Sequence, residues 1–158
     1  MVSGSLPAPA ASATSKARLR LWIRLLRVTR LLDGELRERL RREFNVTLPR
    51  FDVMAALCRA PEGMIMSQIS RFLMVSNGNV TGIVDRLVGD GLVIRAQRRD
   101  DRRTSIVRLT KKGRDRFEEM AAAHESWIDE LLGGMTPEEA DELSTRLSLF
   151  RSDWEGAA

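Results

Sequence analysis

The 158-residue sequence contains no tyrosine, one cysteine and one histidine. A single cysteine excludes an intramolecular disulfide framework and is typical of a reducing cytoplasm. An enzyme site would need a cluster of nucleophiles, bases or metal ligands, and the sequence offers too few of these groups to build one. We therefore expect a protein that is not an enzyme and that carries neither a metal nor another cofactor.

Long hydrophobic runs are also missing, because no apolar stretch approaches the roughly 18 residues of a membrane-spanning helix. The first fifteen residues, MVSGSLPAPAASATS, lack the basic start and the apolar centre of a signal peptide. Their alanine, serine and proline content predicts a disordered tail over residues 1–15. The expected location is the cytoplasm, with no membrane partner.

Positive charge is concentrated in one part of the chain. From Arg86 to Arg116 inclusive there are eleven Arg and Lys against four Asp and Glu, a local net charge of +7. The whole chain carries +4, so the remaining residues sum to −3. A concentrated positive charge is what a polyanionic partner requires, and it indicates binding to double-stranded DNA.

A long amphipathic helix is expected over residues 16–44, because its apolar residues recur at three- and four-residue steps and no proline interrupts them. These apolar residues are Leu19, Trp22, Leu25, Leu26, Leu32, Leu36, Leu40 and Phe44. A small domain cannot cover so long a helix alone, which indicates contacts with a partner. A second helix is expected from Leu48 to about Arg59, with Pro49 in its first turn.

The next two helices form a helix-turn-helix pattern. Ser67 suits the N-cap of a short helix over residues 68–73, and Ser76 suits the N-cap of a longer one. The expected buried stripe of the longer helix consists of Val80, Ile83, Val84, Leu87 and Val88. Gly91 can end this helix in a left-handed backbone conformation.

A wing should follow, because residues 93–96 and 105–109 are two β-prone runs around a polar tip. Thr110 suits the N-cap of a fifth helix, which the pair Gly133-Gly134 ends. The run Thr136-Pro137-Glu138-Glu139 is a capping box that opens a sixth helix. The apolar stripe of this last helix is formed by Leu143, Leu147, Phe150 and Trp154.

The predicted fold class is mainly α with a small β-wing, a winged helix-turn-helix with amino- and carboxyl-terminal dimerisation helices. Residues 47–110 would form the DNA-binding domain, and residues 16–46 and 111–158 would form the dimerisation helices. Neither long apolar stripe can be covered within one small chain, so we expect a homodimer.

An ordered series of residues in the winged part resembles the MarR family of winged helix-turn-helix regulators. The series is Ser76, Val80-Thr81, Val84-Asp85-Arg86-Leu87, Gly91-Leu92-Val93, Arg95, Asp101-Arg102-Arg103, Leu109-Thr110 and Gly113. The resemblance covers nearly everything after the amino-terminal tail. It implies a dimer formed by the first and last helices, which binds a palindromic operator, usually as a repressor that a small ligand releases. Arg99 stands where the family often has a proline, which implies a more mobile and more basic wing tip.

The fourth helix provides the candidate contacts to DNA bases. Asn77, Asn79 and Thr81 lie opposite its apolar stripe. Asparagine can pair with adenine edges, and threonine can contact a thymine methyl group or a phosphate. Gly78 would allow a close approach of the backbone to DNA. The alternative is an ordinary solvated polar face.

Contacts to the DNA backbone and the minor groove are expected from Ser76, from Arg86 and from the wing. Arg86 could instead pair with an acidic neighbour. In the MarR pattern, the aspartate at Asp101 holds Arg103 in line for the minor groove. The other arginines of the tip, which would contact phosphate or remain solvated, are Arg98, Arg99 and Arg102.

The first helix combines Trp22 with several arginines, among them Arg24 and Arg27. An aromatic ring beside guanidinium groups could bind a carboxylate or a phosphate-bearing ligand. Alternatively, these arginines pair with the acidic end of the chain, which has eleven acids and two bases from Phe117 onward. The stretches 48–53 and 73–81 also resemble a subgroup of the family that responds to aromatic acids or their coenzyme A thioesters.

The only cysteine and the only histidine could indicate redox sensing or metal binding. Cys58 lies near the end of an apolar helix face without a partner cysteine, which favours a core role over redox sensing. His124 has no cysteine or carboxylate at ligand spacing and is expected to be structural.

Taken together, the charge pattern, the resemblance and the arginines of the first helix lead us to expect a homodimeric repressor released by an anionic ligand. The alternatives are a redox sensor that uses Cys58 and a nonspecific nucleoid protein.

Overall fold

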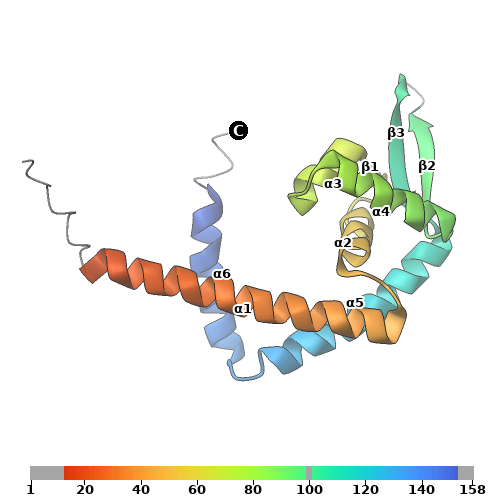
Figure 1. Cartoon of the computed structure of the whole chain (residues 1–158). Coiled ribbons are helices and arrows are strands. Elements are labelled where there is room, and N and C mark those ends of the chain that lie inside the picture. The colour runs from red at the N-terminus through yellow and green to blue at the C-terminus, as the bar shows by residue number, and fades with distance from the viewer. Residues whose placement is uncertain (1–12, 99–100, 153–158) are drawn as a thin grey trace, which may run out of the picture.

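The computed structural model describes residues 13–98 and 101–152. Its elements are α1 (Ala13–Phe44), α2 (Leu48–Cys58), β1 (Met64–Ile65), α3 (Met66–Leu73), α4 (Asn77–Gly89), β2 (Val93–Arg98), β3 (Asp101–Leu109), α5 (Lys111–Leu131) and α6 (Pro137–Ser152). Apart from the short strand β1, this is the predicted order. The fold is mainly α with a small antiparallel sheet, and β2 and β3 form the wing (Figure 1), which confirms the predicted winged helix-turn-helix.

The second helix, α2, lies at the centre of the fold. It packs against α1, α3, α4, α5 and β3. Its Val53 and Met54 side chains are completely buried. The same hydrophobic core extends from Leu40 near the end of α1 to Met120 in α5. The helix-turn-helix and the flanking helices α1 and α5 therefore share one close-packed core.

The wing belongs to a three-stranded antiparallel sheet with the order β1-β3-β2. Val93 pairs with Leu109 at its base, and an irregularity in the pairing lies between Gln97 and Arg98. Both wing strands are longer than the predicted runs 93–96 and 105–109. The unpredicted strand β1 pairs with Ile106 and Val107 in the second half of β3, and this pairing joins the start of α3 to the wing.

Local capping signals operate largely as predicted. Gly91 has φ of +70°, and the N–H groups of Gly91 and Leu92 donate to the carbonyls of Val88 (2.9 Å) and Leu87 (3.0 Å). This pair of bonds is a Schellman motif, which ends α4 where expected. At the start of α5, the Thr110 hydroxyl oxygen accepts from the Gly113 N–H at 2.9 Å.

The predicted capping box opens α6. The Thr136 N–H donates to the Glu139 carboxylate at 2.9 Å, and the Glu139 N–H donates to the Thr136 hydroxyl oxygen at 3.3 Å. Two of the otherwise unpaired N–H groups at this helix start are thus satisfied reciprocally.

Three predictions at element ends were wrong. Residues 13–15 begin α1 and so do not belong to a tail, whereas residues 1–12 lie outside the described part of the chain. The third helix begins at Met66, before Ser67, because the Gln68 side chain accepts from the Ile65 N–H at 3.0 Å and caps the helix from within. Val88 is 38% exposed, since Leu87 and Leu92 already fill the core-facing positions at the end of α4.

The two end helices keep apolar surface in water. In Figure 1 the amino-terminal half of α1 extends away from the helix-turn-helix. Leu19, Trp22 and Leu31 of this helix are 56%, 58% and 68% exposed. Every residue of α6 whose exposure is described, including Leu143 and Leu147, is exposed as well. Within the described residues, no helix combines the length and the apolar character that a membrane crossing requires.

Candidate nucleic-acid interface

The fourth helix has one face in the core and one in solvent. Val80, Val84 and Leu87 are completely buried. The predicted contact residues Ser76, Gly78, Asn79, Thr81 and Arg86 are all exposed. The side chain of Asn77, the first residue of α4, lies outside the described part. The structure thus brings the predicted residues of this helix onto one solvent-facing surface.

The start of α4 differs from expectation in one detail. Ser76 occupies the N-cap position, but its side chain makes no capping hydrogen bond. Its carbonyl accepts from the N–H groups of Asn79 (3.1 Å) and Val80 (3.3 Å). A Cβ added to Gly78 would meet nothing within 4 Å, so packing inside the chain does not require a glycine there. An external surface that approaches the backbone closely is a physical reason for it.

An ion pair that the sequence did not reveal links the fourth helix to the wing. The Arg95 guanidinium of β2 lies 2.7 Å from the Asp85 carboxylate of α4. Arg86, for which an acidic partner was the alternative, makes no ion pair with any residue of the described part. The pair between Asp85 and Arg95 fixes the wing relative to α4, and its neighbour Arg86 remains directed to solvent.

The strands of the wing extend beyond the helix-turn-helix in Figure 1. The backbone of Arg98 pairs with that of Asp101 at the end of the described ladder. Arg99 and the side chains of Arg98, Asp101, Arg102 and Arg103 lie outside the described residues. Their assigned roles, including the positioning of Arg103 by Asp101, therefore stay predictions.

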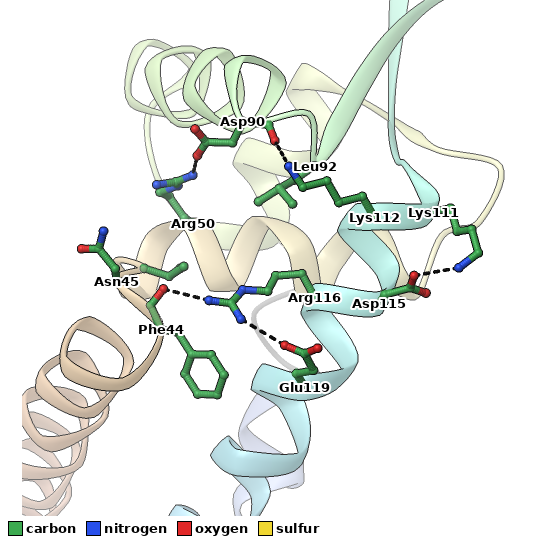
Figure 2. Close-up of a pocket in the computed structure, with 11 residues that line it drawn as sticks. Phe44, Asn45, Arg50, Asp90, Leu92, Lys111, Lys112, Asp115, Arg116 and Glu119 are labelled. Carbon is green, nitrogen blue, oxygen red and sulfur yellow. Dashed lines mark hydrogen bonds and ion pairs between the residues drawn. The ribbon is translucent and has the colours of Figure 1, made fainter.

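The carboxyl end of α4 is held by cations from two other helices (Figure 2). Arg50 of α2 forms an ion pair with the Asp90 carboxylate. Lys112 of α5 donates to the Asp90 carbonyl at 2.9 Å. The Thr110 hydroxyl donates to the Gly91 carbonyl at 2.8 Å. Positive groups at the negative end of a helix dipole are stabilising, so these contacts fix α4 to α2 and α5.

An open pocket of about 910 Å³ lies beside these contacts, between the ends of α1 and α4 and the first turns of α5. Its cations are already engaged. Arg116 donates to the Phe44 carbonyl at the end of α1 (3.1 Å) and to the Glu119 carboxylate (3.0 Å). Figure 2 shows that the first of these bonds joins α5 to the end of α1, whereas the second lies within α5. The pocket is thus a joint in which basic side chains neutralise two helix ends.

The first helix only partly assembles the predicted ligand site. Arg27 lines a shallow hollow of about 330 Å³ together with Ile23, Leu26, Arg30 and Leu31. Trp22 and Arg24 are exposed and do not line it. All lining residues come from α1, so one chain does not enclose a ligand there.

The two residues weighed for other functions have structural surroundings. His124 is half-buried, its ring stacks on Phe51 with centroids 4.8 Å apart, and burial lowers its pKa. Cys58 is half-buried and packs against the hydrophobic core. No group of three His, Cys, Asp or Glu that could hold a metal occurs within residues 13–98 and 101–152.

Comparisons with known proteins identify the family. A sequence profile described as MarR family matches residues 44–104. The transcriptional activatory protein BadR of Rhodopseudomonas palustris is 32% identical over 127 residues, which cover 78% of this chain and 72% of that protein. The chain belongs to the MarR family. A MarR family regulator from Silicibacter pomeroyi has a crystal structure with a TM-score of 0.75 and 34% identity, covering 90% of this chain and 98% of that one.

A MarR protein bound to DNA has the same fold as this chain. The structure of a mutant E. coli MarR complexed with operator DNA matches with a TM-score of 0.75 and 25% identity, over 88% of this chain and 99% of that one. This MarR-family chain is accordingly a DNA-binding transcriptional regulator and not an enzyme. The matched profile includes every predicted DNA-contact residue from Ser76 to Arg103, and it excludes Trp22, Arg24 and Arg27.

Proposed function

We propose that this MarR-family protein is a cytoplasmic homodimer that binds a palindromic operator and represses transcription until a small anionic, aromatic ligand releases it. The observation that supports operator reading is the solvent-facing polar surface of α4, whose opposite face is buried in the core. A helix fixed in this way can place its amino-terminal half in a major groove with a defined orientation.

In this proposal α4 reads bases and the wing contacts the adjacent backbone and minor groove. Base contacts come from Asn77, Asn79 and Thr81, with Gly78 allowing close approach. Phosphate contacts come from Ser76, Arg86, Arg98, Arg99 and Arg102, and the minor-groove contact comes from Arg103, positioned by Asp101. Residues 47–110 bind DNA, and residues 16–46 and 111–158 dimerise.

Selection from random duplex DNA tests the proposal. The protein should enrich one palindrome and bind it by about 10³-fold or more over random DNA at physiological salt. Equal binding to all sequences would instead identify a nonspecific nucleoid protein. The sign of regulation needs a separate test, because the relative from R. palustris is named an activatory protein. An operator–reporter assay distinguishes activation from repression, and we expect repression.

The ligand is proposed to be an anion because the exposed first half of α1 is basic. Arg27 and Arg30 line the hollow on this helix, and a second chain could close it. The resemblance of residues 48–53 and 73–81 to the aromatic-acid subgroup supports an aromatic acid or its coenzyme A thioester. Trp22, Arg24 and Arg27 would then contact the ligand.

Operator release by benzoate, or by its coenzyme A thioester, tests the ligand site. Replacing Arg24 and Arg27 together by Ala should leave operator affinity largely unchanged and should sharply weaken release. The matched control replaces Arg41 and Arg42, exposed arginines at the other end of α1, and should respond like wild type. If the double variant of Arg24 and Arg27 is released normally, the anchor is wrong. Loss of the response in Cys58→Ser would favour a redox sensor.

A further inference from the structure

The turn between α3 and α4 contains a residue in an unfavourable conformation. Met74 has φ of 54° and ψ of 37°, in the left-handed region that favours glycine. Its N–H donates to the Arg71 carbonyl at 3.2 Å, and the Val75 N–H donates to the Ser70 carbonyl at 3.1 Å. The backbone therefore needs this conformation to end α3, but the fold does not use the methionine side chain, which is 93% exposed.

Met74 belongs to an exposed apolar surface, here called the apolar turn, formed by Phe72, Met74 and Val75. Phe72 and Val75 are 47% and 40% exposed. Turns in water are commonly made of Gly, Asn, Asp and Ser. Two exposed apolar residues in this turn, next to Phe72 in the last turn of α3, indicate a surface that is covered by another molecule.

The surroundings of the apolar turn suit a polyanion. No Asp or Glu occurs from Gly63 to Val84, although the chain has 22 such residues. Arg71 is exposed, and the Arg59 guanidinium lies 5.9 Å from the centroid of the Phe72 ring. The turn is also continuous with the start of α4, because Met74 lies three residues before Asn77.

We propose that the apolar turn is part of the DNA interface and that Met74 packs against the C5 methyl group of a thymine in the major groove. This inference rests on the proposed function, in which the amino-terminal end of α4 enters that groove. The thymine methyl is the apolar group that the major groove presents. Met74 is long and unbranched and lies three residues before α4, so its side chain could contact this methyl group while the polar residues of α4 contact base edges. Met74 would thereby favour thymine at one position of each half-site.

Thymine-to-deoxyuridine replacement tests this contact, because deoxyuridine lacks only the methyl group. The probe is the palindrome that wild-type protein selects from random duplex DNA, with one thymine replaced at a time. At one position in each half-site wild type should lose about fourfold in affinity, the effect of one buried methyl group. Met74→Leu should keep this preference. Met74→Gly and Met74→Gln should bind the thymine operator about fourfold more weakly and should not distinguish the two bases.

The thermal stability of the variants separates contact from folding. Met74→Gly should melt at a higher temperature than wild type, since glycine adopts the left-handed conformation without strain, and weaker DNA binding then cannot arise from unfolding. Two results would contradict the contact: equal affinity of Met74→Gly and wild type for the thymine operator, or an equal loss of affinity by both proteins at every thymine-to-deoxyuridine replacement. The apolar turn would then belong to an interface with a protein partner. If wild type selects no sequence at all, the proposed function itself fails.

Discussion

Asp52 of α2 is a carboxylic acid held partly out of water where α2 faces α1. Burial, helped by the negative charge of Asp33 and opposed by Arg37, raises the pKa of its carboxyl group from 3.8 to about 6. The folded state therefore binds this proton more tightly than the unfolded state. The stability that results is fully present below the unfolded pKa of 3.8 and is lost as the pH rises through about 6.

Replacing Asp52 with Asn should remove this dependence. The variant should melt at a higher temperature than wild type at about pH 7, because no buried charge has to form, and the difference should shrink toward about pH 4. Thermal unfolding followed by circular dichroism across this range measures both effects. A variant less stable than wild type near neutral pH would show that the ionised carboxylate gains more from Arg37 than it loses by burial.

Asp101 and Arg103 of β3 form the second test at the scale of single residues. Arg103→Ala should weaken operator binding by roughly 1–3 kcal/mol, the effect of losing one directed groove contact. Asp101→Ala should weaken it too, because Arg103 would no longer be positioned. Long-range electrostatics predicts the opposite sign for this second change, since a negative charge near DNA is removed. Fluorescence anisotropy with a labelled operator measures both variants, and tighter binding by Asp101→Ala would refute the positioning role.

Sequence patterns predicted several helix ends whose cause is local, although Ser67 does not cap α3 and the Ser76 side chain makes no capping hydrogen bond. The left-handed Gly91, the Thr110 cap and the box at Thr136 depend on neighbours within about four positions, which a sequence displays directly. The ion pair between Asp85 and Arg95 could not be predicted, because it exists only once α4 and β2 have packed together. An aspartate followed ten residues later by an arginine carries no such information alone.

At the scale of elements, the joint between the end of α4 and the start of α5 depends on one glycine. A Cβ added to Gly113 would lie 1.9 Å from the Leu92 carbonyl oxygen, a separation that no side chain tolerates. Because the obstacle is backbone, α5 or the turn after α4 would have to move. The same contact explains why a glycine follows Thr110 in the series that resembles the family.

Gly113→Ala should therefore destabilise the protein by roughly 1–3 kcal/mol or more, as overpacking of a closed contact does. Gly89→Ala is the matched control, because its Cβ would meet nothing within 4 Å and it lies in the last turn of α4. That change should be neutral or slightly stabilising, since alanine is the better helix former. Urea unfolding gives the free energy of unfolding of both variants. Equal values would mean that α5 or the turn after α4 moves to accept the added methyl group without loss of stability.

Element boundaries were predictable only as far as a periodic pattern extends. The strand β1 has two residues, too few to show any alternation, and it forms because β3 offers a free edge. The wing strands continue beyond the β-prone runs since each residue paired in the ladder extends it regardless of its own preference. Helix periodicity predicted α1, α4 and α5 because three or more turns repeat the signal.

For the whole molecule, the DNA-binding half was more predictable than the assembly. The helices of the helix-turn-helix and the strands of the wing follow one another closely in the chain, so their order and spacing are visible in the sequence. Periodicity shows that the first and last helices are amphipathic, but it does not show what covers them. The structure of one chain leaves these apolar side chains in water, among them Leu19, Trp22 and Leu31 of α1 and Leu143, Leu147 and Leu149 of α6.

A symmetric dimer is the simplest arrangement that covers both surfaces, because each copy then buries the apolar face of the other. We expect analytical ultracentrifugation at micromolar concentration to give about twice the chain mass of 17.8 kDa. Leu31→Glu would place a charge in the interface and should yield monomers. Met74→Glu makes the same change at an exposed apolar residue of the helix-turn-helix and should remain dimeric. A folded wild-type monomer at this concentration would refute the symmetric dimer. Each monomer would then bind one half-site of the operator independently of the other.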